Sequence, residues 1–184
     1  HPARLPRDVL ERASVRLAVA SLTCAAVFLL AFPVMNFAPP AAGDLQVANA
    51  VAAANVILSL AVFGLTRARL SAERLLDLGL VYEVLLGFGL SLAELYATYE
   101  PEGAVRGVSW VALWIVAFPA VVPSTTGKTL LAALATATTG PVAILIAIAT
   151  GTEAPSARGF AYMVTPNYVA AGLADWAELA DMPA

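Results

Sequence analysis

The third long apolar run of this chain carries ionisable side chains, and these are the residues best placed to do chemistry. The run extends from Leu75 to Ala97 and contains Asp77, Glu83 and Glu94. Glu83 lies eight residues into it, which is about 12 Å along a helix with a rise of roughly 1.5 Å per residue. An ionised carboxylate at membrane depth costs roughly 2.5–3.5 kcal/mol. We therefore expect Glu83 to have a compensating partner.

Small and acidic residues recur along one face of this run. At about 100° of rotation per residue, the shared face holds Gly79, Glu83, Gly87, Leu90 and Glu94. Glycines let neighbouring helix backbones approach closely, and carboxylates avoid lipid. This seam of glycines and carboxylates should therefore face other helices.

Two interpretations of Glu83 remain open at this stage. It could form a proton-responsive or cation-binding site. Alternatively, the seam could serve only helix packing, with the carboxylate protonated or hydrogen-bonded to Asn49, Asn55 or Tyr82. A small transporter would show more intramembrane ionisable groups and an internal repeat, and no repeat is evident.

The sequence Gly127 to Thr129, GKT, invites comparison with a phosphate-binding loop. That motif needs another glycine five positions before Gly127, where Val122 stands, and it needs a preceding strand. We expect a simpler role, in which Lys128 lies at the lipid headgroups and nearby hydroxyls cap the next helix. These hydroxyls belong to Ser124, Thr125 and Thr126.

Aromatic residues and prolines mark the fourth and later runs. Trp110 and Trp114 are one helical turn apart and are expected to be interfacial anchors or packing residues. A pigment or quinone contact is the more specific alternative. Three prolines, Pro119, Pro141 and Pro166, are candidate hinges.

Composition excludes several kinds of active site. His1 is the only histidine and Cys24 the only cysteine, so a histidine-ligated haem or zinc, a cysteine metal cluster and an internal disulfide are not expected. A serine hydrolase triad is not supported either. We expect a chain without catalytic or metal-binding residues and without an identifiable cofactor, although bound lipid or pigment stays open.

The apolar runs that position these residues indicate a membrane protein. With 60% hydrophobic and 12% charged residues and a mean hydropathy of +0.82, the chain is too apolar for a soluble domain. We predict an all-α, polytopic integral membrane bundle of about six transmembrane helices. The expected spans are 17–37, 45–65, 75–97, 105–122, 129–150 and 160–174.

Polar segments flank this membrane domain, which covers residues 17–174. Residues 1–16 are expected to form a cytoplasmic juxtamembrane segment with a short interfacial helix, and residues 175–184 an acidic amphipathic tail. Basic residues concentrate on one side of the predicted topology: Arg4, Arg7, Arg12, Arg16, Arg67, Arg69, Arg74 and Lys128, against Arg106 and Arg158 on the other. The positive-inside rule then places both termini in the cytoplasm.

Three segments carry a resemblance to a known family: RLLDLGLVYEVLLGFGLSLAE (Arg74 to Glu94), RGVSWVALWIVAFPAVVPSTTGKTLLAALATATTGP (Arg106 to Pro141) and PNYVAAGLA (Pro166 to Ala174). They resemble the N-terminal multi-pass membrane region of some bacterial serine/threonine protein kinases. The resemblance covers about the last two thirds of the chain and implies a sensory or anchoring module joined to a cytoplasmic kinase domain. After Ala174 the acidic sequence DWAELADMPA departs from the basic connection that the resemblance implies, and no kinase motif occurs here.

These observations lead to a functional hypothesis with one main alternative. The chain is expected to be a non-catalytic module of the bacterial cytoplasmic membrane that anchors and regulates a signalling domain, with Glu83 as its polar switch and Gly87 as a further flexible point. Its expected partners are lipids and other membrane chains, not nucleic acid, since the net charge is −3. The alternative is a structural accessory subunit of a respiratory or photosynthetic membrane complex.

Overall fold

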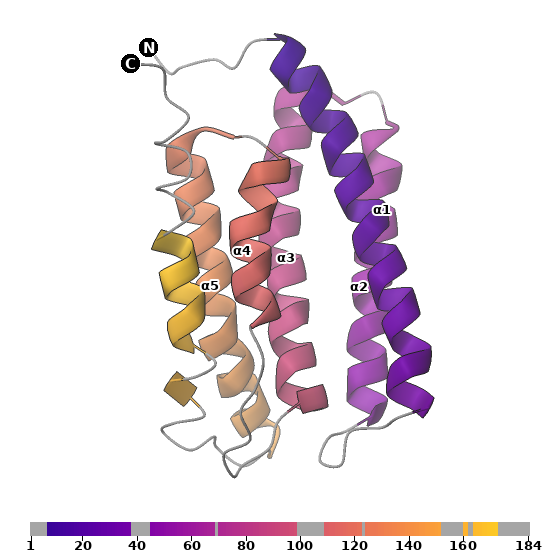
Figure 1. The fold of residues 1–184 in the computed structure, drawn as a ribbon, viewed down its shortest axis with the longest axis vertical. Helices are drawn as coiled ribbons and strands as arrows, with labels where there is room; N and C mark the ends of the chain where they lie inside the picture. Colours follow the sequence, from indigo (N-terminus) through magenta and orange to yellow (C-terminus); the bar gives the residue numbers. More distant parts are fainter. Residues whose placement is uncertain are drawn as a thin grey trace.

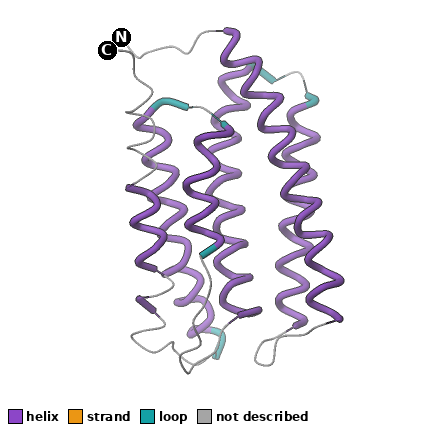
Figure 2. Tube along the Cα trace, in the orientation of Figure 1, coloured by secondary structure: helices purple, strands orange, loops and turns teal. Residues whose placement is uncertain are grey.

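The structure, a computed structural model, describes residues 7–37, 45–68, 70–98, 109–122, 124–151, 160–161 and 164–172. Within these ranges the regular elements are helices, and no strand occurs (Figure 1, Figure 2). They are α1 (Arg7–Phe37), α2 (Leu45–Thr66), α3 (Ala72–Thr98), α4 (Trp110–Val121) and α5 (Thr126–Ala149). Residues 164–172 are also helical. The prediction of an all-helical fold is confirmed.

Four of the described helices are long and apolar enough to cross a membrane: α1, α2, α3 and α5. The fourth expected span, 105–122, is represented by α4, which has 12 residues and a length of about 18 Å. Residues 105–108 lie outside the described residues. The sixth expected span contains the helical residues 164–172, and Pro166 and Asn167 lie within that helix and do not interrupt it.

Helix α1 is longer than its apolar part. We expected a separate short helix before residue 17, but one continuous helix extends from Arg7 to Phe37. The residues between Arg7 and Leu17 include arginine, leucine, glutamate and alanine, all good helix formers, and no glycine or proline. Nothing in this sequence therefore ends the helix at the edge of the apolar run.

Helix α3 lies at the centre of the bundle (Figure 1). It packs against α1 and α2 on one side and against α4 and α5 on the other. Successive helices alternate in direction, so α3 and α5 run parallel to each other. This arrangement explains why α3 combines a high apolar content with the carboxylates of the seam.

Two glycines allow α2 and α5 to approach α3 closely. A Cβ atom on Gly87 would collide with Cγ2 of Thr136 in α5, and a Cβ atom on Gly89 would collide with the amide of Asn55 in α2. Residues two positions apart are about 200° apart around a helix. Gly87 and Gly89 therefore serve opposite faces of α3, each against a different neighbour.

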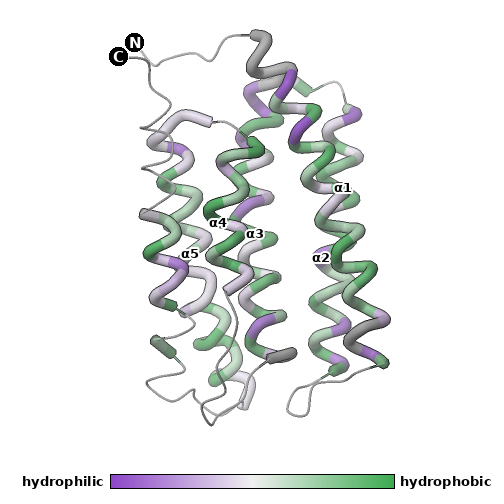
Figure 3. The backbone as a smooth tube through the Cα atoms, in the orientation of Figure 1, coloured by the Kyte–Doolittle hydropathy of each residue, from purple (hydrophilic) through white to green (hydrophobic). Residues whose placement is uncertain are grey.

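The interior of the bundle is apolar, and so is much of its outer surface. One buried cluster includes Leu17, Val62, Tyr82, Leu86 and Phe118. Hydrophobic residues occur along the length of the labelled helices (Figure 3). Many large apolar side chains are exposed, among them Leu30, Ile57, Leu131 and Leu145. An outer surface of this kind matches a lipid environment and not water.

The packing at Gly87 yields a first prediction. Gly87→Ala should lower the free energy of unfolding by about 1–3 kcal/mol, because the new methyl group overpacks the contact with Thr136. Adding Thr136→Ser should recover part of this loss, since serine lacks the colliding methyl group. Unfolding of the purified chain in detergent would measure both effects.

The matched control is Gly64→Ala in α2, where no atom lies within 4 Å of the added Cβ. This change should leave stability unchanged or raise it by up to about 1 kcal/mol, because alanine favours the helix. Equal stability of the Gly87→Ala and Gly64→Ala variants would contradict the close α3–α5 contact.

Candidate functional site

Glu83 is the most unusual polar residue in the described part of the chain. Its side chain is 0% exposed, and neither carboxylate oxygen has a hydrogen-bond partner among the described residues. The Glu83 side chain therefore lies in the interior of the bundle. A buried polar group without partners costs free energy, and a buried unpaired charge costs more. Glu83 is thus a destabilising feature of α3 that packing alone does not explain.

The hydrogen bonds that we considered between Glu83 and Asn49, Asn55 or Tyr82 do not occur among the described residues. The hydroxyl of Tyr82 lies 2.9 Å from Ser59 Oγ and links α3 to α2. Asn49 exchanges hydrogen bonds with Asn36, each 3.1 Å long, between α1 and α2. Asn55 lies against Gly89 on the opposite side of α3. These amide and hydroxyl groups take part in the contacts among α1, α2 and α3, and none of them forms a hydrogen bond with the Glu83 carboxylate.

The backbone of Glu83 is tied to α4 although its side chain is not. The indole Nε1 of Trp114 donates a hydrogen bond of 2.9 Å to the Glu83 carbonyl oxygen. The Trp114 ring packs edge-on against Tyr82 at 5.9 Å between centroids and lies 5.0 Å from Phe118. This aromatic cluster connects α3 and α4 beside the buried carboxylate.

A second buried polar atom without a partner lies one turn further along α3. Thr136 is 0% exposed and packs on Gly87, and its Oγ1 atom has no hydrogen-bond partner among the described residues. The contact between α3 and α5 therefore contains both an acceptor and a hydroxyl that can still form bonds. Chemically, the Glu83 carboxylate can take up a proton, and the Thr136 hydroxyl can donate or accept a further hydrogen bond. The described residues include no group of three or more histidine, cysteine, aspartate or glutamate residues that could hold a metal ion.

Glu94, the other carboxylate of the seam, has a different environment from Glu83. Its Oε1 atom accepts hydrogen bonds from the backbone N–H groups of Trp110 and Val111 at the start of α4. Ser109 Oγ, the N-cap side chain of α4, lies 3.2 Å from Glu94 Oε1 and 3.0 Å from Asn167 Oδ1, so its single proton serves one acceptor at a time. A carboxylate at a helix N-terminus is stabilised by the unpaired N–H groups and the helix dipole. Glu94 therefore joins α3 to the start of α4, and Ser109 extends this contact to Asn167 in the helical residues 164–172.

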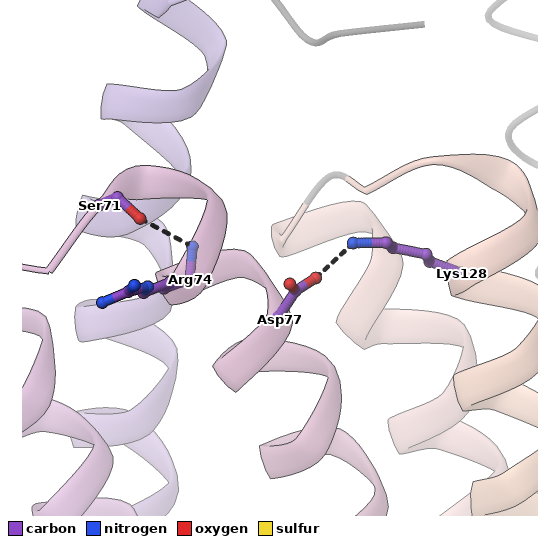
Figure 4. A network of polar contacts seen from close by, with 4 residues as sticks. All are labelled: Ser71, Arg74, Asp77 and Lys128. Atoms are coloured by element: carbon purple, nitrogen blue, oxygen red, sulfur yellow. Dashed lines mark hydrogen bonds and ion pairs between the residues drawn. The ribbon is translucent and has the colours of Figure 1, made fainter. Parts of the chain in front are cut away.

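Lys128 forms an ion pair with Asp77 at the opposite end of α3 (Figure 4). Both side chains are more than half exposed, so the pair contributes little stability but connects the beginnings of α3 and α5. The helix cap that we expected is present in part, since Thr125 is the N-cap residue of α5 but its side chain makes no capping bond. No strand precedes the GKT sequence, and a phosphate-binding loop is absent from this described segment.

The two tryptophans of α4 do not share one environment. Trp110 is 64% exposed and remains a candidate anchor at a membrane interface, whereas Trp114 is half-buried in the aromatic cluster. Of the two roles considered for Trp114, the structure therefore supports packing. Helices α4 and α5 continue through Pro119 and Pro141, and the hinge role of these prolines stays a prediction.

Sequence reasoning missed Gly89 and its contact with Asn55, as well as the capping role of Glu94. A signal for Gly89 was present, because the GFG sequence at 87–89 places glycines on opposite faces of a helix. No sequence signal links Glu94 to Ser109, since the contact depends on where α4 begins.

Comparisons with protein-family models, with curated proteins and with solved structures find no match to this chain. Its function is therefore inferred from the residues and geometry described above.

Glu83 gives a prediction about stability. Glu83→Met should raise the free energy of unfolding by about 1–3 kcal/mol, because it removes a buried carboxylate that has no partner among the described residues and keeps a similar volume. Glu73→Met, at an exposed position in the first turn of the same helix, should lower stability by no more than about 1 kcal/mol, the contribution of a carboxylate near a helix N-terminus. Denaturant unfolding in detergent would measure both. A loss of stability in Glu83→Met would mean that the carboxylate is bonded in the folded chain.

Glu94, in contrast to Glu83, is predicted to stabilise the folded chain. Glu94→Ala and Ser109→Ala should each lower the free energy of unfolding by about 1–2 kcal/mol, because each removes acceptors from the start of α4. The double variant should lose less than the sum, since the two groups act on the same helix terminus. Glu73→Ala is the exposed control, and strictly additive losses would show that Glu94 and Ser109 act independently.

Proposed function

We propose that this chain is a multi-pass module of the bacterial cytoplasmic membrane that anchors and regulates a cytoplasmic signalling domain and is not itself catalytic. The observation that carries this proposal is Glu83, a buried carboxylate without a hydrogen-bond partner among the described residues, between helices that otherwise pack tightly. A destabilising group of this kind suits a position where two packings of the helices differ by little free energy. The attached domain is a serine/threonine kinase, and this step rests on the resemblance of the sequence alone.

The proposed signal is a displacement of α3 relative to α4 and α5. A proton or a small ligand at Glu83 would favour one packing of these helices, because it changes the cost of burying the carboxylate. The Asp77–Lys128 ion pair joins α3 and α5, so a shift between these two helices would also move the two charged groups at the basic end of the bundle. That end is the one proposed to face the cytoplasm.

Six spans with both termini in the cytoplasm are the proposed topology. Exposed basic side chains support it, because they lie near the beginnings of α1, α3 and α5 and the end of α2, at one end of the bundle: Arg12, Arg16, Arg67, Arg74 and Lys128. Short basic connections remain preferentially in the cytoplasm.

Single cysteines would test this topology. In a Cys24→Ala background, Ser71→Cys lies at the basic end and Thr150→Cys at the other, both exposed in the structure. A membrane-impermeant maleimide added to intact cells should label Thr150→Cys, whereas Ser71→Cys should react only after permeabilisation. Labelling of Ser71→Cys in intact cells would overturn the proposed orientation.

Glu83 variants would test the regulatory role. In the full-length protein, Glu83→Gln and Glu83→Ala should change the signalling output, measured as kinase autophosphorylation in native membranes, and Glu73→Gln should not. If both Glu83 variants leave stability and output unchanged, Glu83 is not the switch. The mass of the native polypeptide provides an independent check, since an attached kinase requires a mass far above 19.0 kDa.

A structural accessory subunit is the second candidate, and the outer helices favour it. Only 17% of the apolar stretch of α1 and 28% of that of α2 are buried within the chain. A larger membrane complex could cover the exposed faces of these two helices. If the chain is such a subunit, its native polypeptide should have a mass near 19.0 kDa and should copurify with other membrane chains. Glu83→Gln should then have no effect on its function.

A further inference from the structure

A groove runs between α1 and α2 at the basic end of the bundle. Its lining consists of Ser14, Val15, Ala18, Val19 and Leu22 of α1 and Phe63, Thr66 and Arg67 at the end of α2, and its volume is about 350 Å³. The lining is mainly apolar, and the hydroxyl of Thr66 already donates to the Phe63 carbonyl oxygen at 2.7 Å. The groove therefore offers an apolar surface and not a set of hydrogen-bonding groups.

Cationic groups stand at the mouth of this groove. The guanidinium of Arg67 lies 4.7 Å from the centroid of the Phe63 ring, in a cation–π contact with the groove wall. Arg12 is exposed and precedes Val15 and Val19 by three and seven residues, spacings that put it on the same side of α1 and nearer the end of the bundle. A ligand in the groove would meet positive charge only at this one end.

The wider surroundings have the same sign of charge. Among the described side chains at this end, Arg12, Arg16, Arg67, Arg74 and Lys128 outnumber Glu73 and Asp77 by five to two. Asp77 is already paired with Lys128. The free charge near the groove is therefore positive, which favours an anionic ligand.

We propose that this groove is a binding site for an anionic phospholipid of the surrounding membrane. One acyl chain lies along the apolar walls between α1 and α2, and the phosphate group is held by Arg67 and Arg12. Guanidinium groups form strong, charge-assisted hydrogen bonds with phosphate oxygens. A free phosphate ion would leave the apolar walls uncovered, so the observations favour a lipid as the source of the phosphate.

This site is independent of the regulatory role of Glu83. It lies on the α1–α2 pair, whereas Glu83 belongs to α3, where its carbonyl oxygen accepts a hydrogen bond from Trp114 of α4 and Gly87, one turn further, packs on Thr136 of α5. A lipid bound here joins α1 and α2 at the end where basic residues gather, and it adds contacts to the two least buried of the four long apolar helices that the structure describes.

The test is a lipid titration of the purified, delipidated chain by native mass spectrometry, with phosphatidylglycerol and phosphatidylcholine as probes. We expect tighter binding of phosphatidylglycerol and a roughly fivefold loss of its affinity in Arg67→Gln, as for the removal of one basic residue near a phosphate surface. Arg74→Gln, an exposed charge at the same end outside the groove walls, should have no such effect.

A second pair of variants tests the apolar part of the site. Ala18→Phe should fill the groove and reduce the binding of both lipids, and Ala26→Phe, at an exposed position further along α1, should not. Equal binding of the two lipids, unchanged phosphatidylglycerol affinity in Arg67→Gln, or full binding in Ala18→Phe would each overturn the proposal. If the chain binds no lipid but forms a dimer that Ala18→Phe abolishes, the groove is a contact between two copies and the proposal is overturned.

Discussion

The close contact of α3 with α5 and α2 depends on the absence of side chains at Gly87 and Gly89. Helices in lipid gain little from the hydrophobic effect when they associate, because lipid tails are as apolar as the helix surface. Close van der Waals contact must therefore supply much of the attraction. Glycine on both faces of α3 allows α2 and α5 to reach the same helix from opposite sides, and the remaining helices are arranged around this three-helix contact.

The polar contacts of α3 complement this packing. Near its beginning, Asp77 pairs with Lys128 of α5, and near its end, Glu94 accepts hydrogen bonds from the start of α4. Between them, the carboxylate of Glu83 is buried without a partner among the described residues. Helix α3 is thus bonded to α5 and α4 near its ends and, through Tyr82 and the Glu83 backbone, to α2 and α4 in the middle, where only the Glu83 carboxylate lacks a partner among the described residues. A small rearrangement in the middle could occur while the contacts at the ends persist.

Much of this fold could be predicted from the sequence, because the apolar runs and the helical spacing depend on residues close together in the chain. The inward face of α3, with Gly79, Glu83 and Gly87, follows from the rotation per residue alone. The actual partners of these residues could not be predicted, because Thr136, Asn55 and Ser109 meet α3 through tertiary packing. The continuous start of α1 was missed for another reason, since the edge of an apolar run marks a change of solvent and not the end of a helix.

The beginning of α4 at Trp110 has a consequence for the bilayer itself. In a membrane, the outward-facing row of α4 extends about 18 Å, whereas the hydrocarbon layer is about 30 Å thick. Lipids beside α4 meet a described helix that matches only part of their length, while those beside α1 and α2 meet helices of full length. The chain would therefore deform its surroundings unevenly, and the α4 side is where a thinner membrane or another short helix would relieve the mismatch.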